Sequence, residues 1–407
     1  MKSVSRSSIL FALLYFVQGS ALAYVQSFQK SYLNESGVSS NDIALITSLL
    51  LLPFVLKLIF AFVADLLASK VANPKKLLMR IGLFISAAGF AAAATVDPAD
   101  HFYVFTILML AASSGTACYD TCADGLAIVI SSTRERSYIQ AAMISGKSAG
   151  FIIMAGLFGL VGQRFGYPSI LLSLGALSLL PLALLSSVQE PIAANKTFQP
   201  LKELRWLLTP HTLCFIAFAF SYAMISFGGD GLMSYFLKLR FDTPIDQLGS
   251  YGSLRGIGAI FGAISSALLV IRVGFKRLGS ASLMCVAIVL WFTPQWLTPE
   301  NRLSFAALWG FVWGLQEGIF LTLAMNLSPK KFATTAFALF MMVGNLGTAV
   351  GDGSSTALVD TWGFVKVFHT LALMSVVPLI LYNLCLFLTK RQEKLQLDNV
   401  IDIQSKK

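Results

Sequence analysis

Charged residues are scarce in this sequence. Only 12% of its 407 residues are Asp, Glu, Lys or Arg, whereas 56% are hydrophobic. Soluble globular proteins carry roughly 25% charged residues, and a compact body this poor in charge would not stay in solution. The composition excludes a soluble protein and indicates one that is embedded in a lipid bilayer.

Cysteine and histidine are also rare. The five cysteines all fall inside apolar runs, so we expect small buried residues and no disulfide framework. The three histidines lie near the ends of predicted helices, without the spacing of metal ligands. No nucleophile with a neighbouring base stands out at membrane depth. The sequence therefore predicts no metal, no cofactor and no enzymatic activity.

Long apolar runs fill the chain instead. Each is close to the roughly 20 residues that a helix needs to cross the hydrocarbon core, and a helix satisfies its own backbone hydrogen bonds in lipid. The alternating pattern of an outer-membrane barrel is absent. The sequence predicts an all-α integral membrane protein with twelve transmembrane helices. They span residues 8–27, 42–66, 77–95, 102–130, 138–162, 168–187, 210–237, 248–271, 278–293, 303–327, 334–359 and 366–389.

One long connector, which contains Pro191 and Pro200, divides the predicted helices into two groups of six. The other connectors are short, as packed antiparallel helices require. The predicted domains are an N-terminal six-helix bundle (1–187), a cytoplasmic central loop (188–209), a C-terminal six-helix bundle (210–389) and a cytoplasmic tail (390–407).

Positive charge gathers on one side of the predicted membrane. The two termini and the connectors on their side hold 20 of the 30 Lys and Arg residues, and the opposite connectors hold six. Because Lys and Arg prefer the cytoplasmic side, we expect both termini in the cytoplasm, with the protein in a bacterial inner membrane. The net charge of +10 follows from this topology and indicates no nucleic acid partner.

Charges within the predicted helices are the candidate functional residues. A charge at membrane depth is costly and marks a functional site by default. Three bases and five acids lie there: Lys57, Lys147, Arg255, Asp120, Asp124, Asp230, Glu317 and Asp352.

The embedded acids also indicate an internal repeat. Asp120 and Glu317 each stand eleven residues before the connector that follows their helix, and these are the fourth helices of the two halves. Two six-helix repeats joined by a central loop are the layout of the major facilitator fold. All the embedded charges fall on helices that this fold does not place outermost, against lipid.

Two motifs carry a closer resemblance. The segment Leu52–Asp65, which begins Leu-Pro-Phe-Val-Leu-Lys, resembles the second-helix signature of the muropeptide permeases and of their relatives, the acetyl-coenzyme A transporters. Tyr119–Gly125, with two aspartates four residues apart, is similar to the fourth helix of these proteins. Three shorter matches accompany them, at Tyr15–Gly19, Arg134–Arg136 and Gly146–Gly150.

The resemblance implies a major facilitator permease for muropeptides or coenzyme A esters. It also implies a cytoplasmic gate loop after the second helix, with Asp65 as its acid and Arg80 at the cytoplasmic edge of the third helix. Arg80 can reach the interface because long basic side chains extend toward water.

One cluster of charges is expected near the middle of the membrane. Asp120 and Asp124 share a helical face, and Lys57 and Lys147 lie at similar depth. These residues could form a structural ion-pair network, a proton or substrate site, or both. We expect Asp120 and its counterpart Glu317 to carry a coupling proton, and Lys57, Asp124 and Lys147 to bind substrate or form ion pairs.

A second cluster is expected nearer the outer surface. Asp230, Arg255 and Asp352 stand about seven or eight residues from the outer ends of their helices. We expect an ion pair between Asp230 and Arg255, and an outer gate formed by all three residues. Glycines flank both acids, and glycine weakens a helix enough to allow bending.

These observations predict a monomeric secondary active transporter that works by alternating access. Its partners would be protons and a small solute. Five embedded acids against three bases leave some acid unpaired or protonated, and burial favours a neutral carboxyl group; this indicates proton symport. The embedded bases indicate an anionic solute. The alternative is a proton-independent facilitator or exchanger of organic anions.

Overall fold

The computed structural model describes residues 2–67, 70–130, 133–186, 188–190, 204–328 and 333–405. All the regular elements in these ranges are helices. The first half of the chain forms α1 (Lys2–Ser27), α2 (Gln29–Glu35), α3 (Ser40–Val55), α4 (Lys57–Leu67), α5 (Pro74–Ala93), α6 (Phe102–Ile130), α7 (Thr133–Phe165), α8 (Tyr167–Leu179) and α9 (Leu182–Leu185).

The second half follows the short helix η1 (Leu204–Leu208). It forms α11 (Pro210–Phe241), α12 (Ile245–Val273), α13 (Phe275–Trp296), α14 (Arg302–Leu327), α15 (Ala333–Met374) and α16 (Val376–Ser405). Proline stands in the first turn of α5, α8 and α11, where its missing N–H costs no hydrogen bond.

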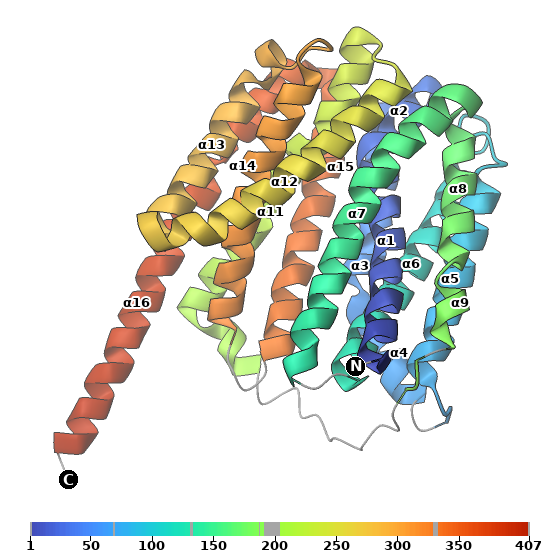
Figure 1. Cartoon of the computed structure of the whole chain (residues 1–407). Helices are drawn as coiled ribbons and strands as arrows, with labels where there is room; N and C mark the ends of the chain where they lie inside the picture. The colour runs from blue at the N-terminus through green and yellow to red at the C-terminus, as the bar shows by residue number, and fades with distance from the viewer. Residues whose placement is uncertain are drawn as a thin grey trace.

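Twelve membrane crossings follow from these helices. Eleven candidate spans lie within the described residues, and the last, from Ala336 to Arg391, is 56 residues long. A helix of that length would measure about 84 Å, far beyond the roughly 30 Å hydrocarbon core. Gly363, with φ of 74°, breaks it into two crossings. The predicted twelve-helix architecture is confirmed, and both chain ends lie at the same end of the bundle (Figure 1).

The second crossing is interrupted. A turn at Leu56 separates α3 from α4, and Pro53 lies one turn before the break. Proline lacks an N–H and crowds the preceding turn of a helix, so Pro53 weakens the last turns of α3 before this break. Lys57 is the first residue after it.

The two halves are related as repeats. Within the halves, α1 packs on α7 and α11 packs on α15; between them, α7 packs on α12 and α15 packs on α3. Figure 1 shows α7 and α12 side by side where the halves meet. If the twelve crossings are numbered along the chain, crossing 1 packs on 5 and crossing 7 on 11 within the halves. Between the halves, crossing 5 packs on 8 and crossing 11 on 2. Exchanging the halves turns each contact into its counterpart, as the repeat read from the sequence predicts.

We call the end of the bundle that holds the chain termini the near end, and the opposite end the far end. Two glycines allow the halves to approach closely in the far part. A Cβ atom on Gly249 of α12 would lie 2.5 Å from the carbonyl oxygen of Ala155 in α7, and one on Gly353 of α15 would lie 1.9 Å from Ser48 Oγ in α3. At Gly249 the neighbouring atom is backbone, so only glycine fits there; at Gly353 it is the end of the Ser48 side chain.

Most helix ends lie within a few residues of the predicted positions, but α1 begins six residues earlier than expected, at Lys2, and the sixth crossing is divided into α8 and α9. Two further differences are larger. The twelfth helix was expected to end at 389, but α16 continues to Ser405 and projects beyond the other helices (Figure 1). The first crossing was expected to be followed by a connector from residue 28, but this segment forms α2.

Candidate functional site

Lys57 and Asp120 form an ion pair between α4 and α6. The Asp120 side chain is 1% exposed and that of Lys57 is 32% exposed, so solvent reaches only the cation. The Lys57 ammonium nitrogen also lies 5.6 Å from the centre of the Phe54 ring, within range of a cation–π interaction. The break before α4 places the lysine at this point.

Asp124, one turn after Asp120, has a different partner. The hydroxyl of Tyr15 in α1 donates a hydrogen bond to Asp124 Oδ1. Asp124 is half-buried, and among the described residues it makes no ion pair. Lys57 therefore pairs with Asp120 rather than Asp124, although all three lie at similar depth.

Glu317 of α14 has a similar partner in the other half. The hydroxyl of Tyr222 in α11 donates to Glu317 Oε2. Glu317 is also half-buried and makes no ion pair with any described residue.

Lys147 of α7 is exposed and forms no ion pair or hydrogen bond within the described part of the chain. It lies close enough to Asp120, Asp124 and Glu317 to interact with them electrostatically. Lys57, Asp120, Asp124, Lys147 and Glu317 are called the central cluster below. The cluster draws on both halves, because Glu317 belongs to the second.

Asp230 of α11 and Arg255 of α12 form an ion pair toward the far end. The Arg255 Nε atom lies 2.7 Å from Asp230 Oδ1, and both side chains are buried. The Trp309 indole N–H donates to the same carboxylate oxygen over 2.7 Å, and a guanidinium N–H of Arg255 donates to Gln26 Oε1 of α1 over 2.9 Å. The ion pair expected from the sequence is present, and Arg255 also connects it to the other half.

Asp352 of α15 pairs with Lys30 of α2, and this contact was not expected. Lys30 was expected in the connector after the first helix; instead it belongs to α2, is 5% exposed and also donates to the backbone oxygen of Gly231 over 2.9 Å. Asp352 is still a neighbour of Asp230, near enough for electrostatic interaction.

Further polar contacts join the halves at the far end. Lys238 of α11 pairs with Glu35 of α2 at 2.5 Å. Ser40 at the start of α3 donates to Asp360 of α15 over 2.6 Å. Like the ion pair of Lys30, these contacts hold the far ends of the halves together.

The expected gate-loop residues lie toward the near end. Asp65 belongs to α4, and its side chain is outside the described part of the structure. Arg80 of α5 is exposed. The gate role of these two residues stays a prediction.

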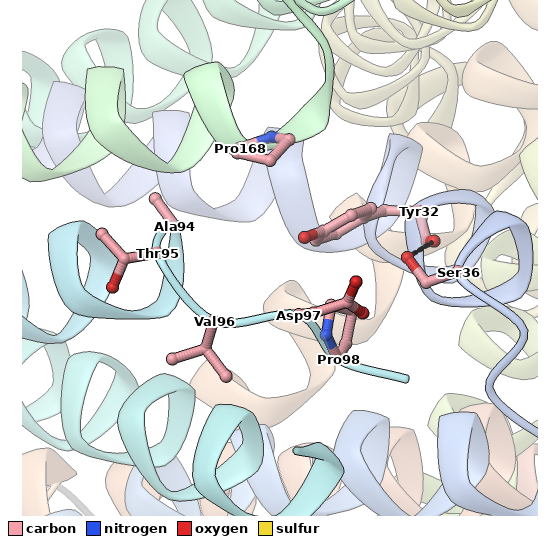
Figure 2. A pocket seen from close by; sticks show the side chains of 8 residues that line it. All are labelled: Tyr32, Ser36, Ala94, Thr95, Val96, Asp97, Pro98 and Pro168. Atoms are coloured by element: carbon pink, nitrogen blue, oxygen red, sulfur yellow. Dashed lines mark hydrogen bonds between the residues drawn. The ribbon is translucent and has the colours of Figure 1, made fainter. Parts of the chain in front are cut away.

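A surface pocket of about 330 Å³ lies away from both clusters. Tyr32, Ser36, Asp97 and Pro168 are among the residues that line it, and all belong to the first half (Figure 2). None of the predicted site residues contributes to this pocket.

The profile of the Major Facilitator Superfamily matches residues 8–352. The chain belongs to the major facilitator superfamily. It is an integral membrane transporter of small solutes and not an enzyme, as the sequence predicts. No curated protein matches the sequence.

Solved structures of this superfamily share the fold. A mutant of the nucleoside transporter NupG is 16% identical, with a TM-score of 0.78, over 94% of this chain and 99% of that one. The D-xylose-proton symporter is 14% identical, with a TM-score of 0.70, over 95% and 96%. A bacterial homologue of the human lysosomal transporter Spinster is 13% identical, with a TM-score of 0.69, over 95% and 96%. At such identities the likeness shows the fold alone.

Several partners of the predicted site residues were not themselves predicted; among them are Tyr15, Tyr222, Lys30, Gln26 and Trp309. Tyr15 opens one of the short segments behind the family resemblance, and that was its only signal. Tyr222 is one of several aromatic residues in an apolar run. The excess of embedded acids over bases could have indicated that a cation such as Lys30 reaches the interior.

Proposed function

We propose that this major facilitator protein is a secondary active transporter that moves a small anionic solute together with protons. The observation that carries the proposal is the environment of Lys147. It is an exposed cation without an ion-pair partner in the described structure, and it lies beside acids of both halves. A solute that binds there would contact the two parts that move against each other in alternating access.

The charge of the solute follows from the bases. Nucleosides and xylose are uncharged, and the transporters NupG and the xylose symporter share only the fold with this chain. Lys147 and the partly exposed Lys57 would be costly in a site for a neutral solute. They suit a carboxylate or phosphate group. Among anions, the family resemblance of the second and fourth helices favours a muropeptide-like or coenzyme A ester-like solute.

The acids of the central cluster would bind the coupling proton. Asp120, Asp124 and Glu317 lie where solvent reaches part of the cluster, and a carboxylate has an accessible neutral form. The sequence favours Asp120 and Glu317 for this role. Because Lys57 pairs with Asp120 and not with Asp124, Asp124 is a further candidate for this role.

The clusters also fit alternating access. The contacts of Arg255, Asp230, Lys30 and Asp352 hold the far ends together, so solvent would reach the central cluster from the near end. The charge bias of the connectors assigns the near end to the cytoplasm, where Asp65 and Arg80 would belong to the inner gate. We propose a monomer in a bacterial inner membrane, with two six-helix domains, 1–187 and 210–389, around the central loop 188–209 and a cytoplasmic tail, 390–407.

A thermal-shift screen of the purified protein would test the solute class. The probes are muropeptides, coenzyme A esters and, as neutral controls, nucleosides and xylose. We expect an anionic probe to raise the melting temperature. The Lys147→Gln variant should need at least a tenfold higher concentration of that probe for the same shift. Stabilisation by the neutral probes alone would contradict the proposal.

Uptake into proteoliposomes would then test coupling. The stabilising probe should accumulate when a proton gradient is imposed. If it only equilibrates, at a rate that the gradient does not change, the protein is a facilitator or exchanger of organic anions.

A further inference from the structure

Two tyrosine–carboxylate pairs occupy matching places in the two halves. Tyr15 and Tyr222 lie on the first crossing of each half, and their partners Asp124 and Glu317 lie on the fourth. Each tyrosine donates its hydroxyl hydrogen to one carboxylate oxygen. The correspondence is visible only when the Tyr15–Asp124 contact of the first half is compared with the Tyr222–Glu317 contact of the second.

The tyrosines also match in their position along the helix. Tyr15 stands thirteen residues after Lys2, where α1 begins, and Tyr222 stands twelve after Pro210, where α11 begins. The acids are offset by about one helical turn, because Asp124 stands six residues before the end of α6 at Ile130 and Glu317 ten before the end of α14 at Leu327.

The partner of a buried carboxylate limits its protonation states. A lysine ammonium has three donors and no acceptor, so the contact of Lys57 suits Asp120 only when it is ionised. A tyrosine hydroxyl can donate to a carboxylate or accept from a neutral acid. The Tyr15 and Tyr222 contacts can thus persist in both states of Asp124 and Glu317, whereas protonation of Asp120 would leave Lys57 without its partner.

We propose that the Tyr15–Asp124 and Tyr222–Glu317 pairs exchange the coupling protons, while Asp120 stays ionised beside Lys57. The inference rests on the proposed proton coupling and assigns it to particular residues. Water that reaches the cluster delivers a proton to the carboxylate, which becomes a neutral acid and later returns the proton to water. Each tyrosine keeps its own proton and acts as a positioning residue.

Lys147 would connect solute binding to these pairs. Its charge acts on Asp124 of its own half and on Glu317 of the other half. An anion bound at Lys147 would cancel that charge and favour protonation of both acids. Protonation of the two acids would in turn favour anion binding by the same free energy, because the coupling between two binding events is reciprocal.

Infrared titration of the reconstituted protein tests the assignment without any solute or gradient. The carboxylic acid C=O band should contain components that disappear on Asp124→Asn and on Glu317→Gln but persist on Asp120→Asn. Tyr15→Phe and Tyr222→Phe each remove a hydrogen bond to an ionised carboxylate. Each should move its component to higher pH by about 1 unit.

Tyr24→Phe is the matched control, because the Tyr24 hydroxyl on α1 is buried without a hydrogen-bond partner among the residues that the structure describes. It should leave all components unmoved. Loss of a component in Asp120→Asn, or unmoved components in both Tyr15→Phe and Tyr222→Phe, would overturn the inference. Because the titration reports protonation and not transport, it is independent of the outcome of the uptake assay, which tests the proposed function.

Discussion

Lys30 of α2 and Asp352 of α15 form an ion pair that joins the two halves of the protein at the far end. The Lys30 side chain is 6% exposed and that of Asp352 is 13% exposed. The pair has no counterpart in the central cluster, where the ion pair of Lys57 and Asp120 stays within one half. In alternating access the far ends must separate, so this contact must break in each cycle.

The first prediction concerns this pair. Lys30→Met or Asp352→Asn leaves its partner buried without its counter-charge, which costs about 3–5 kcal/mol in typical proteins. Each single variant should lower the melting temperature, and the double variant should recover most of the loss. Purified proteins in one detergent provide the comparison. If the losses of the two single variants simply add in the double variant, the residues do not interact.

Opening of the far end is a separate readout for the same variants. Ser27, in α1, is buried between the halves, where it faces Gly252 of α12. In a Ser27→Cys background, the double variant should react faster with a membrane-impermeant maleimide than the protein with Lys30 and Asp352 intact. Equal rates would mean that the pair does not hold the far end closed.

The second prediction concerns the close contact of Gly353 with Ser48. A Cβ atom at 353 would lie 1.9 Å from Ser48 Oγ but 3.3 Å from Ser48 Cβ. Gly353→Ala should therefore disfavour the state in which α15 and α3 touch, and raise the rate of maleimide labelling in the same Ser27→Cys background. Adding Ser48→Ala removes the clashing oxygen and should restore most of the original rate. Labelling that Gly353→Ala leaves unchanged would contradict the predicted clash.

The third prediction concerns Asp230 and Arg255. Neutralising either residue leaves a buried charge unpaired, so Asp230→Asn and Arg255→Gln should each cost about 3–5 kcal/mol. The double variant should lose less unfolding free energy than the two single variants lose together, and the difference should be about 0.5–3 kcal/mol. Trp309 is a second donor to Asp230, so Trp309→Phe alone should cost less than Arg255→Gln. Additive losses in a thermal-unfolding cycle would rule out the ion pair.

The fourth prediction concerns topology. Because most basic residues flank the side of the termini, reporters fused after Lys407 and within 188–209 should both give cytoplasmic signals. A reporter inserted at 298–300, in the connector before α14, should give the opposite signal. A periplasmic signal from the fusion after Lys407 would contradict the proposed orientation.

Much of the fold could be predicted from the sequence because the bilayer constrains it. Runs such as Phe102–Ile130 must be helical to satisfy their backbone groups. The Asp230–Arg255 ion pair could be predicted because both residues lie at similar distances from the same ends of consecutive helices. Distance along a helix gives depth, and two opposite charges at one depth are reasonable partners.

The partners in the central cluster could not be predicted in this way. Asp120, Asp124, Lys57 and Lys147 lie at similar depth, and depth alone does not give the direction in which each side chain points. Packing decides that Lys57 meets Asp120 and that Tyr15 meets Asp124. Lys30 was missed for a related reason: it lies beyond the length of one crossing, and only the contact of α2 with α11 and α15 brings it inside.

The measurement that tests the central claim most directly is proton-driven accumulation of the solute identified in the thermal-shift screen. In proteoliposomes with an alkaline interior, the native protein should raise the internal concentration above the external one. Glu317→Gln should abolish this accumulation while preserving counterflow between equal pools, since the amide resembles the protonated acid and counterflow needs only the loaded protein to reorient. Asp120→Asn in the same assay examines the acid that the sequence favours. Accumulation that persists in Glu317→Gln, Asp124→Asn and Asp120→Asn alike would contradict a coupling proton in the central cluster.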